Sequence, residues 1–193
     1  MELLVTRHQT ESLATLLVCA LPEEAAHLGS GVLVTGPGKV RASVALTHAL
    51  ASQRPDQVIV CGTAGALDPS LHGVLEVGRV TEHDLDTTAI SAVVGTDYGR
   101  TLQLSDSGHH LATGDQFISG HRAEALRERG FELVDMEGFA FAMAAQECGV
   151  PIRIVKAVSD TAEADALGSW RSNVDRCSHQ LAAWLDQEGV MRA

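Results

Sequence analysis

The sequence predicts an α/β fold: a single three-layer domain over residues 1–193, with a central mixed, mostly parallel twisted sheet flanked by helices. Two observations support this prediction. Short apolar runs rich in β-branched residues alternate along the chain with segments of helical pattern. The length of 193 residues suits one domain with a substantial buried core, and no repeat, linker or low-complexity segment marks a second domain.

The first elements are expected in the order strand, turn, strand. Residues 15–21 (TLLVCAL) form an apolar run typical of a buried strand. Pro22 then opens one acidic helical turn, since proline is tolerated at the first helical position. A second strand is expected at 31–36. An alternative start makes residues 1–7 the first strand and 8–17 its helix, which would replace the acid of this turn, Glu24, by Glu11 or Ser12; we prefer the first version because it forms a more compact unit.

A helix is expected over about 39–53, after the tight turn Gly36-Pro37-Gly38. Its apolar positions are Val40, Val44, Leu46 and Ala49, and Pro55 ends it. A third strand follows at 58–62. Strand, helix and strand at this spacing imply parallel neighbours with a right-handed crossover.

The secondary-structure pattern is weak in the middle of the chain and strong at its end. Residues 68–110 look less regular and carry several histidines, of which His109 and His110 are expected to be exposed. The last helix is expected over about 169–188, where Leu181, Trp184 and Leu185 share one face.

The most informative stretch is residues 133–163, which reads as strand, acidic turn, helix and buried strand. Gly138 opens an apolar helix that stops near Pro151, and the run 152–158 is rich in β-branched residues. Its end delivers Ser159 and Asp160. Because open α/β sheets build their sites at the carboxyl ends of strands, Glu137 and Asp160 are expected to reach one crevice.

Composition excludes several classes of partner. The chain has 25 acidic against 14 basic residues, so no basic stripe is present to neutralise the phosphates of nucleic acid or anionic lipid. The longest apolar run, 13–21, is too short to span a bilayer. The four cysteines lack metal-type spacing and are expected to be free thiols in a reducing compartment. These features predict a cytoplasmic protein with a small, uncharged ligand.

Four segments in order carry a family resemblance. They are TGPGKV at 35–40, VIVCGTAGAL at 58–67, LATGDQFISG at 111–120 and the DMEG-helix-VSD arrangement at 135–160. Together they resemble the purine nucleoside phosphorylase and nucleosidase superfamily, in particular its 5'-methylthioadenosine/S-adenosylhomocysteine nucleosidases. The resemblance implies that the protein hydrolyses the N-glycosidic bond of a purine nucleoside. Relative to that family, an extra pair of strands is missing before TGPGK.

The resemblance also suggests roles for individual residues. Asp160 is the candidate acid that protonates the leaving purine at N7, because a carboxyl in a partly desolvated cleft can hold a proton near neutrality; Ser159 accompanies it. Glu137 is expected to accept the ribose hydroxyls while Met136 packs on the sugar. Structural alternatives remain for both acids: Asp160 as a helix N-cap and Glu137 as a first-turn acid complementing a helix dipole.

Glu24 is the candidate base for the attacking water, with a solvated acid of the helical turn as its alternative. Phe117 is expected to stack on the purine, with Ile118 beside it at the base edge, or else to pack in the core. Thr63 is expected to border the ribose or the water, and Asp115 to fix its own loop. His83, Asp84 and Asp86 are spaced like metal ligands, but a structural loop is the better interpretation, so we expect neither metal nor cofactor.

Three functions remain open. A phosphorylase of this family needs an arginine just before the glycine-rich strand end, and the sequence has valine there, at Val60. Water is therefore favoured as the nucleophile over phosphate. The first alternative is a phosphate-dependent phosphorylase, and the second is a nucleoside-binding protein without catalysis. Because the shortened N-terminal half leaves the 5' side of the ligand under-covered, we also expect a homodimer.

Overall fold

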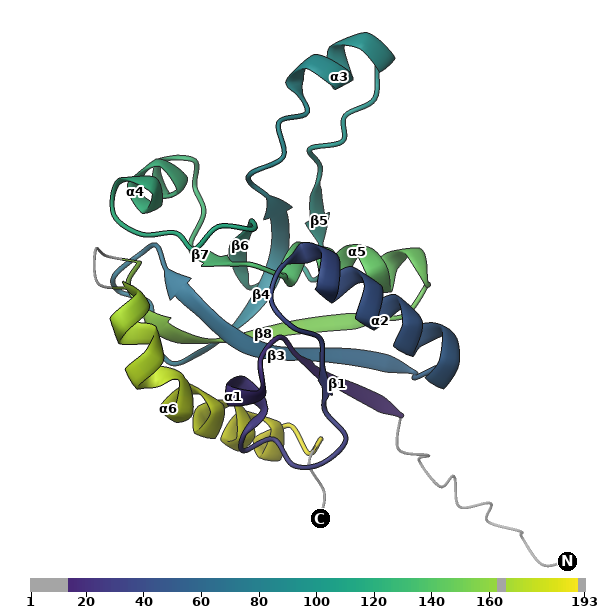
Figure 1. The fold of residues 1–193 in the computed structure, drawn as a ribbon, viewed down its shortest axis with the longest axis vertical. Coiled ribbons are helices and arrows are strands. Elements are labelled where there is room, and N and C mark those ends of the chain that lie inside the picture. The colour runs from purple at the N-terminus through teal and green to yellow at the C-terminus, as the bar shows by residue number, and fades with distance from the viewer. Residues whose placement is uncertain (1–13, 163–165, 191–193) are drawn as a thin grey trace, which may run out of the picture.

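The computed structural model describes residues 14–162 and 166–190, and it has the predicted three layers. Helices α2 and α5 cover one face of the central sheet, and α1 and α6 cover the other (Figure 1). The helices are α1 Pro22–Ala25, α2 Lys39–Gln53, α3 Thr88–Val94, α4 His121–Glu128, α5 Gly138–Glu147 and α6 Ala166–Gln187. The strands are β1 Thr15–Cys19, β2 Leu33–Val34, β3 Gln57–Ala66, β4 Val74–Glu82, β5 Thr101–Gln103, β6 His109–Thr113, β7 Leu133–Asp135 and β8 Ile152–Asp160.

Alternation along β3 builds the two outer layers. Val58 and Val60 pack into the core cluster formed with α2 and α5. Ile59 and Cys61, on the opposite side of the strand, pack with Leu181 and the rest of the apolar face of α6. Because successive side chains of a strand point to opposite faces, one continuous apolar run serves both layers.

The sheet is mixed and mostly parallel, as predicted. Five of the eight strand pairings in the described residues are parallel. The pairings β3–β8, β8–β4, β4–β6, β6–β7 and β7–β3 close into a circuit. The register of the β3–β8 pairing shifts between Ala64 and Gly65, so that Gly65 pairs with Asp160. At the same place β7 pairs with β3 through Val134 and Gly65. The ends of β3, β7 and β8 therefore meet at one place.

Several predicted elements differ from the observed ones. Residues 68–110 contain β4, nine residues long, and an arm carrying α3 that projects from the body (Figure 1). The strand predicted at 31–36 shortens to two residues, whereas the one at 58–62 extends to ten. These differences arise where pairing with a neighbour, rather than local pattern, determines the length of a strand.

Of the four apolar positions expected to form the buried face of α2, two are buried and two are exposed. Leu46 and Ala49 are buried, but Val40 and Val44 are 74% and 66% exposed. His109 and His110 are half-buried rather than exposed: His109 pairs with Glu132 at 2.9 Å, and the His110 ring packs on Phe131. A cross-strand partner and an aromatic neighbour explain this burial.

The N-terminal ambiguity is resolved in part. Residues 15–17 belong to β1, so the alternative helix over 8–17 is wrong for that part. Glu11 and Ser12 lie outside the described residues. At the other end, Leu181 and Leu185 of α6 are fully buried and Trp184 packs beside them, as predicted.

The state of the cysteines agrees with the prediction made from their spacing. All four cysteines are free thiols; Cys19, Cys61 and Cys177 are buried and Cys148 is exposed. In the described residues, no helix has the length and apolar character needed to cross a membrane.

Candidate active site

One cavity of about 220 Å³ lies where the ends of β3, β7 and β8 meet. All the residues predicted for the site line it: Glu24, Thr63, Phe117, Ile118, Met136, Glu137, Ser159 and Asp160. They come from five segments far apart in the sequence. The structure thus brings the predicted residues together, while their individual roles stay predictions.

Glu24 is held by backbone and side-chain donors in the cavity wall. The side chain is buried, and its Oε1 accepts the backbone N–H of Thr63 at 2.7 Å and the Thr63 hydroxyl at 2.8 Å. Its Oε2 accepts the backbone N–H of Leu21 at 3.1 Å, which helps to start α1. A carboxylate offers about four acceptor positions, so one position on Oε2 remains for a water molecule.

Trp170 completes this arrangement from α6. Its indole N–H donates to the Thr63 hydroxyl at 2.9 Å. An indole N–H can only donate, so the Thr63 oxygen accepts from Trp170 and its own proton is left for Glu24.

A buried ion pair lies behind the acids. Lys156, on β8, is 2% exposed, and its Nζ lies 2.8 Å from Asp135 Oδ2. Asp135 also accepts the Thr113 hydroxyl at 2.6 Å and the backbone N–H of Gly138 at 2.8 Å. A methyl group at Gly62 would lie 3.0 Å from Lys156 Nζ and 3.3 Å from Glu24 Oε1, so a larger residue there would crowd both side chains. Burial alone would lower the pKa of Lys156, but the nearby carboxylates raise it above its usual range.

Glu137 is a buried acid of the cavity with a perturbed pKa. Burial first, and the neighbouring charge of Asp135 second, raise its pKa to about 7. Its Oε1 accepts the backbone N–H of Gly38 at 2.8 Å. The remaining acceptor positions of the carboxyl group are available to a ligand, which is what binding of two ribose hydroxyls requires.

Asp160 is oriented by its two neighbours in sequence. Its Oδ2 accepts the Ser159 hydroxyl at 2.7 Å, and its Oδ1 accepts the backbone N–H of Ala162 at 2.9 Å. Ser159 is itself fixed, since its carbonyl accepts the side-chain amide of Asn173 at 2.8 Å. The Ala162 contact is a local turn and not a helix cap, because Ala162 has a left-handed φ of 53°.

The two hydrophobic residues of the 111–120 loop differ in exposure. Phe117 is 42% exposed at the cavity, whereas Ile118 is buried in the cluster beneath α4. Partial exposure leaves the ring of Phe117 free to contact a flat ligand. Because the Ile118 side chain is buried, a hydrogen bond between Ile118 and the edge of the base would have to come from its backbone.

In the loop that carries His83, Asp84 and Asp86, both aspartates have protein partners, whereas His83 Nε2 is buried without a hydrogen-bond partner. Lys39 Nζ lies 2.6 Å from Asp84 and 2.5 Å from Glu82. Asp115 accepts the backbone N–H of Lys39 at 2.8 Å and donates its own N–H to Asp84, so it does fix the loop. Asp86 accepts the backbone N–H of Thr88.

Sequence reasoning missed Asp135, Lys156 and Trp170. Lys156 carried a usable signal, because it is one of only two lysines and lies inside an apolar strand, where an unpaired charge would be costly. Asp135 could then have been inferred as its partner. Nothing in the local pattern of α6 distinguishes Trp170 from a core residue.

The charge of the cavity wall limits its chemistry. Four acids line it: Glu24, Asp135, Glu137 and Asp160. Among the described residues, no arginine, lysine or histidine lines it. The arrangement suits general acid–base chemistry and hydroxyl recognition, and it disfavours a dianionic ligand.

Comparison with known proteins agrees with this geometry. Residues 30–187 match the sequence profile of the Phosphorylase superfamily. A 5'-methylthioadenosine/S-adenosylhomocysteine nucleosidase from Staphylococcus aureus is 29% identical over an alignment of 172 residues, and the match covers 75% of this chain and 74% of that protein.

Solved structures share the fold. A Helicobacter pylori nucleosidase mutant with 5'-methylthioadenosine in its active site matches with a TM-score of 0.82 at 21% identity, over 91% of this chain and 97% of that one. Futalosine hydrolase from the same organism matches with a TM-score of 0.80 at 22% identity, over 89% and 95% of the two chains. With the profile covering most of its length and the predicted fold in place, the chain belongs to the Phosphorylase superfamily.

Proposed function

We propose that the protein is a nucleosidase that hydrolyses the N-glycosidic bond of a purine nucleoside, giving free base and a ribose derivative. The observation that carries the proposal is the cavity of about 220 Å³, whose wall contains three carboxyl groups. They are Glu24, which is hydrogen-bonded to Thr63, Glu137, which is suited to binding sugar hydroxyls, and Asp160 at the end of β8. The nucleosidase relative and the fold of the futalosine hydrolase support it.

In the proposed mechanism each acid has one task. Asp160 donates a proton to N7 of the purine as the C–N bond breaks, because a protonated base leaves more easily. Glu24 accepts a proton from the water that attacks the anomeric carbon, through the free position on Oε2. Glu137 accepts the sugar hydroxyls, and these charged hydrogen bonds strengthen as positive charge develops on the ribose.

Hydrolysis is favoured over phosphorolysis because no described residue of the cavity wall is a cation that could bind phosphate. Phosphate is largely a dianion at neutral pH and needs positive partners. Val60 stands where an arginine would be needed, and the nearby cation, Lys156, is buried and bonded to Asp135. Water needs a base instead, which Glu24 supplies.

The substrate we propose is an adenine nucleoside modified at the 5' position, the class named for the relatives. The cavity wall includes the apolar side chains of Leu21, Phe117, Leu167 and Trp170 beside its acids, which suits an uncharged substituent and a flat base.

A product assay tests this function. Purified protein is incubated with 5'-methylthioadenosine with and without phosphate, and adenine and sugar products are separated by chromatography. Equal rates in both conditions, with a free sugar as product, are expected. Strict phosphate dependence with a sugar phosphate would reassign the protein to the phosphorylases, and binding of the nucleoside without turnover would favour the non-catalytic alternative.

We further propose that the protein acts as a homodimer in the cytoplasm. Exposed apolar residues gather on α2, at Val40 and Val44, and on the α3 arm, at Ile90, Val93 and Val94. Exposed apolar side chains favour a partner surface, and we propose that a second copy of the chain covers them. The buried free thiols support a reducing compartment.

The dimer is tested by sedimentation velocity at micromolar concentration. A dimer is expected for the unchanged protein, and Val44→Glu, placing a charge on the exposed face of α2, is expected to give monomer. His72→Ala, a change at an exposed residue outside α2 and α3, serves as the control. A fully active monomer of the unchanged protein would overturn the proposal.

A further inference from the structure

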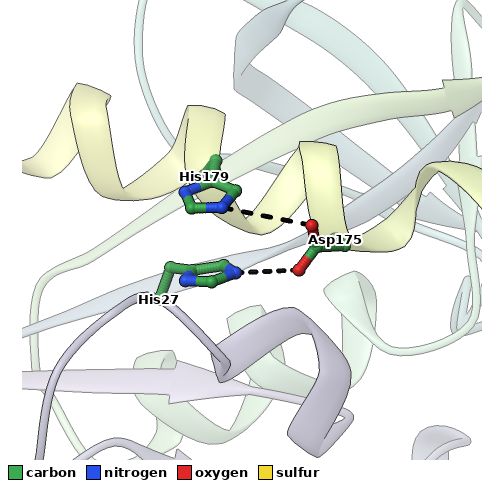
Figure 2. A group of neighbouring side chains, drawn as sticks. All are labelled: His27, Asp175 and His179. Carbon is green, nitrogen blue, oxygen red and sulfur yellow. Dashed lines mark hydrogen bonds and ion pairs between the residues drawn. The ribbon is translucent and has the colours of Figure 1, made fainter.

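A cluster of two histidines and one aspartate lies outside the cavity, between the end of α1 and the exposed side of α6 (Figure 2). His27 follows α1, and Asp175 and His179 are one turn apart on α6. His27 Nε2 lies 2.8 Å from Asp175 Oδ1, and His179 Nε2 lies 4.0 Å from Asp175 Oδ2. One possible ligand atom from each of the three residues lies within 4.8 Å of the other two, and no other such group of three occurs in the described part of the chain.

We propose that His27, Asp175 and His179 bind a divalent transition-metal ion of the Zn²⁺ class, and that the bound ion ties α1 to α6. Two imidazoles and one carboxylate are a recurrent donor set for Zn²⁺ and its first-row neighbours, leaving further positions for water. Nothing in the proposed nucleosidase reaction uses these side chains.

The distances fit such an ion after a small adjustment. Ligand atoms placed about 2.0–2.1 Å from a tetrahedral ion are about 3.3 Å apart. The distances from the Asp175 oxygens to the His27 and His179 nitrogens, 2.8 and 4.0 Å, lie on either side of that value. The two imidazole rings are stacked, with centroids 3.5 Å apart and planes 15° apart. Binding therefore requires the rings to rotate until both Nε2 lone pairs converge. Room for this exists because His179 and Asp175 are 62% and 75% exposed.

The position of the cluster explains why an ion there would affect the fold. The backbone N–H of His27 donates to the buried Ser178 hydroxyl at 3.1 Å, so the chain after α1 already rests on α6. Glu24 lies three residues before His27, and Trp170, which fixes the Thr63 hydroxyl, lies on the same helix as His179. Coordination by ligands from both segments would hold the turn that carries Glu24 against α6.

Direct binding is measured on untagged protein after treatment with a chelator. Titration with ZnCl₂ by calorimetry is expected to give one ion per chain, and CoCl₂ is expected to give the visible absorption of a nitrogen-ligated Co²⁺ ion. His179→Ala and Asp175→Asn are each expected to weaken Zn²⁺ binding by at least about tenfold, since each removes one of three protein ligands. His121→Ala, at an exposed histidine of α4, is the matched control.

Two further readouts test the link between α1 and α6. At a hundredfold excess of Zn²⁺ over its Kd, the melting temperature is expected to rise by about 5–10 °C, and amide exchange in residues 21–28 is expected to slow. Neither effect should occur in His179→Ala. Absence of saturable binding up to about 1 mM Zn²⁺, or equal affinity in Asp175→Asn, His179→Ala and the unchanged protein, would overturn the proposal.

Discussion

The indole N–H of Trp170 donates to the Thr63 hydroxyl 2.9 Å away, and the same hydroxyl donates to Glu24 Oε1 at 2.8 Å. This relay fixes the direction of the Thr63 proton. Trp170→Phe keeps an aromatic ring in the cavity wall but removes the donor, so the hydroxyl can rotate away from Glu24. We expect kcat for nucleoside hydrolysis to fall by about tenfold, the cost of one hydrogen bond, with a smaller change in KM.

A purely structural role for Trp170 predicts something different. If the indole only packs, Trp170→Phe should leave the pH profile of kcat unchanged. If it positions Glu24, the acidic limb of that profile should move, because the hydrogen bonds received by a carboxylate influence its protonation. Thr63→Val, which removes the hydroxyl from the same relay, should reproduce the shift.

Glu24→Gln tests the base. With its oxygen in the place of Oε1, the amide can still accept the two Thr63 donors, but its NH2 group cannot accept the Leu21 N–H and cannot take a proton from water. We expect kcat to fall by about 10²–10⁴-fold, while the Kd for a nucleoside measured by calorimetry stays within a few fold. Unimpaired turnover would exclude Glu24, and loss of activity in Glu11→Gln in its place would move the base to the alternative residue.

Asp160→Asn tests the acid. Asparagine can accept the Ala162 N–H through its oxygen, so the turn is retained, but it has no proton to give to N7. We expect a loss in kcat of about 10²–10⁴-fold with an unchanged melting temperature. A substrate whose leaving group needs no protonation should lose much less activity, and equal losses on both kinds of substrate would contradict this role.

The raised pKa of Glu137 predicts a pH dependence of stability. The carboxyl titrates at about 7 in the folded protein against an ordinary value of 4.5. Between these values the folded state binds more protons than the unfolded state, so the contribution of Glu137 to stability is present below about pH 4.5 and is lost as pH rises through about 7. Glu137→Gln, which keeps an acceptor for Gly38 N–H, should therefore raise the melting temperature at pH 8 relative to the unchanged protein, and raise it less at pH 5.

The role of Glu137 in binding the sugar is checked with the same variant. Glu137→Gln should lower kcat/KM for ribonucleosides by more than it does for the 2'-deoxy analogue, which offers one hydroxyl fewer. Equal losses on the two substrates would show that the carboxyl does not bind the 2'-hydroxyl.

Lys156→Met tests the buried cation. Removing the ammonium leaves Asp135 unpaired beside Glu137 and Glu24, and the loss of one partner of a buried pair costs about 3–5 kcal/mol in free energy of unfolding. Denaturant titration measures it. Adding Glu137→Gln should recover part of the loss by removing one of the competing charges, and a Lys156→Met variant as stable as the unchanged protein would contradict the prediction.

The separate elements of this protein follow from local sequence. The run 152–158, the helix opened by Gly138 and the turn opened by Pro22 lie where periodicity, glycine and proline predict them, because these signals depend on the chain immediately around them. The acids at the ends of these elements could be identified for the same reason. Their convergence on one cavity followed from the rule that strand ends gather at one edge of a sheet.

Only the tertiary structure decided which partners each side chain has. The lengths of β3 and β4, the exposure of Val40 and Val44, and the pairing of Lys156 with Asp135 depend on segments distant in sequence. Trp170 reaches Thr63 across 107 positions, and His27 reaches Asp175 across 148. A local pattern specifies how an element forms and which face is apolar, but contacts between faces depend on how several elements pack at once, and that arrangement exists only in the folded chain.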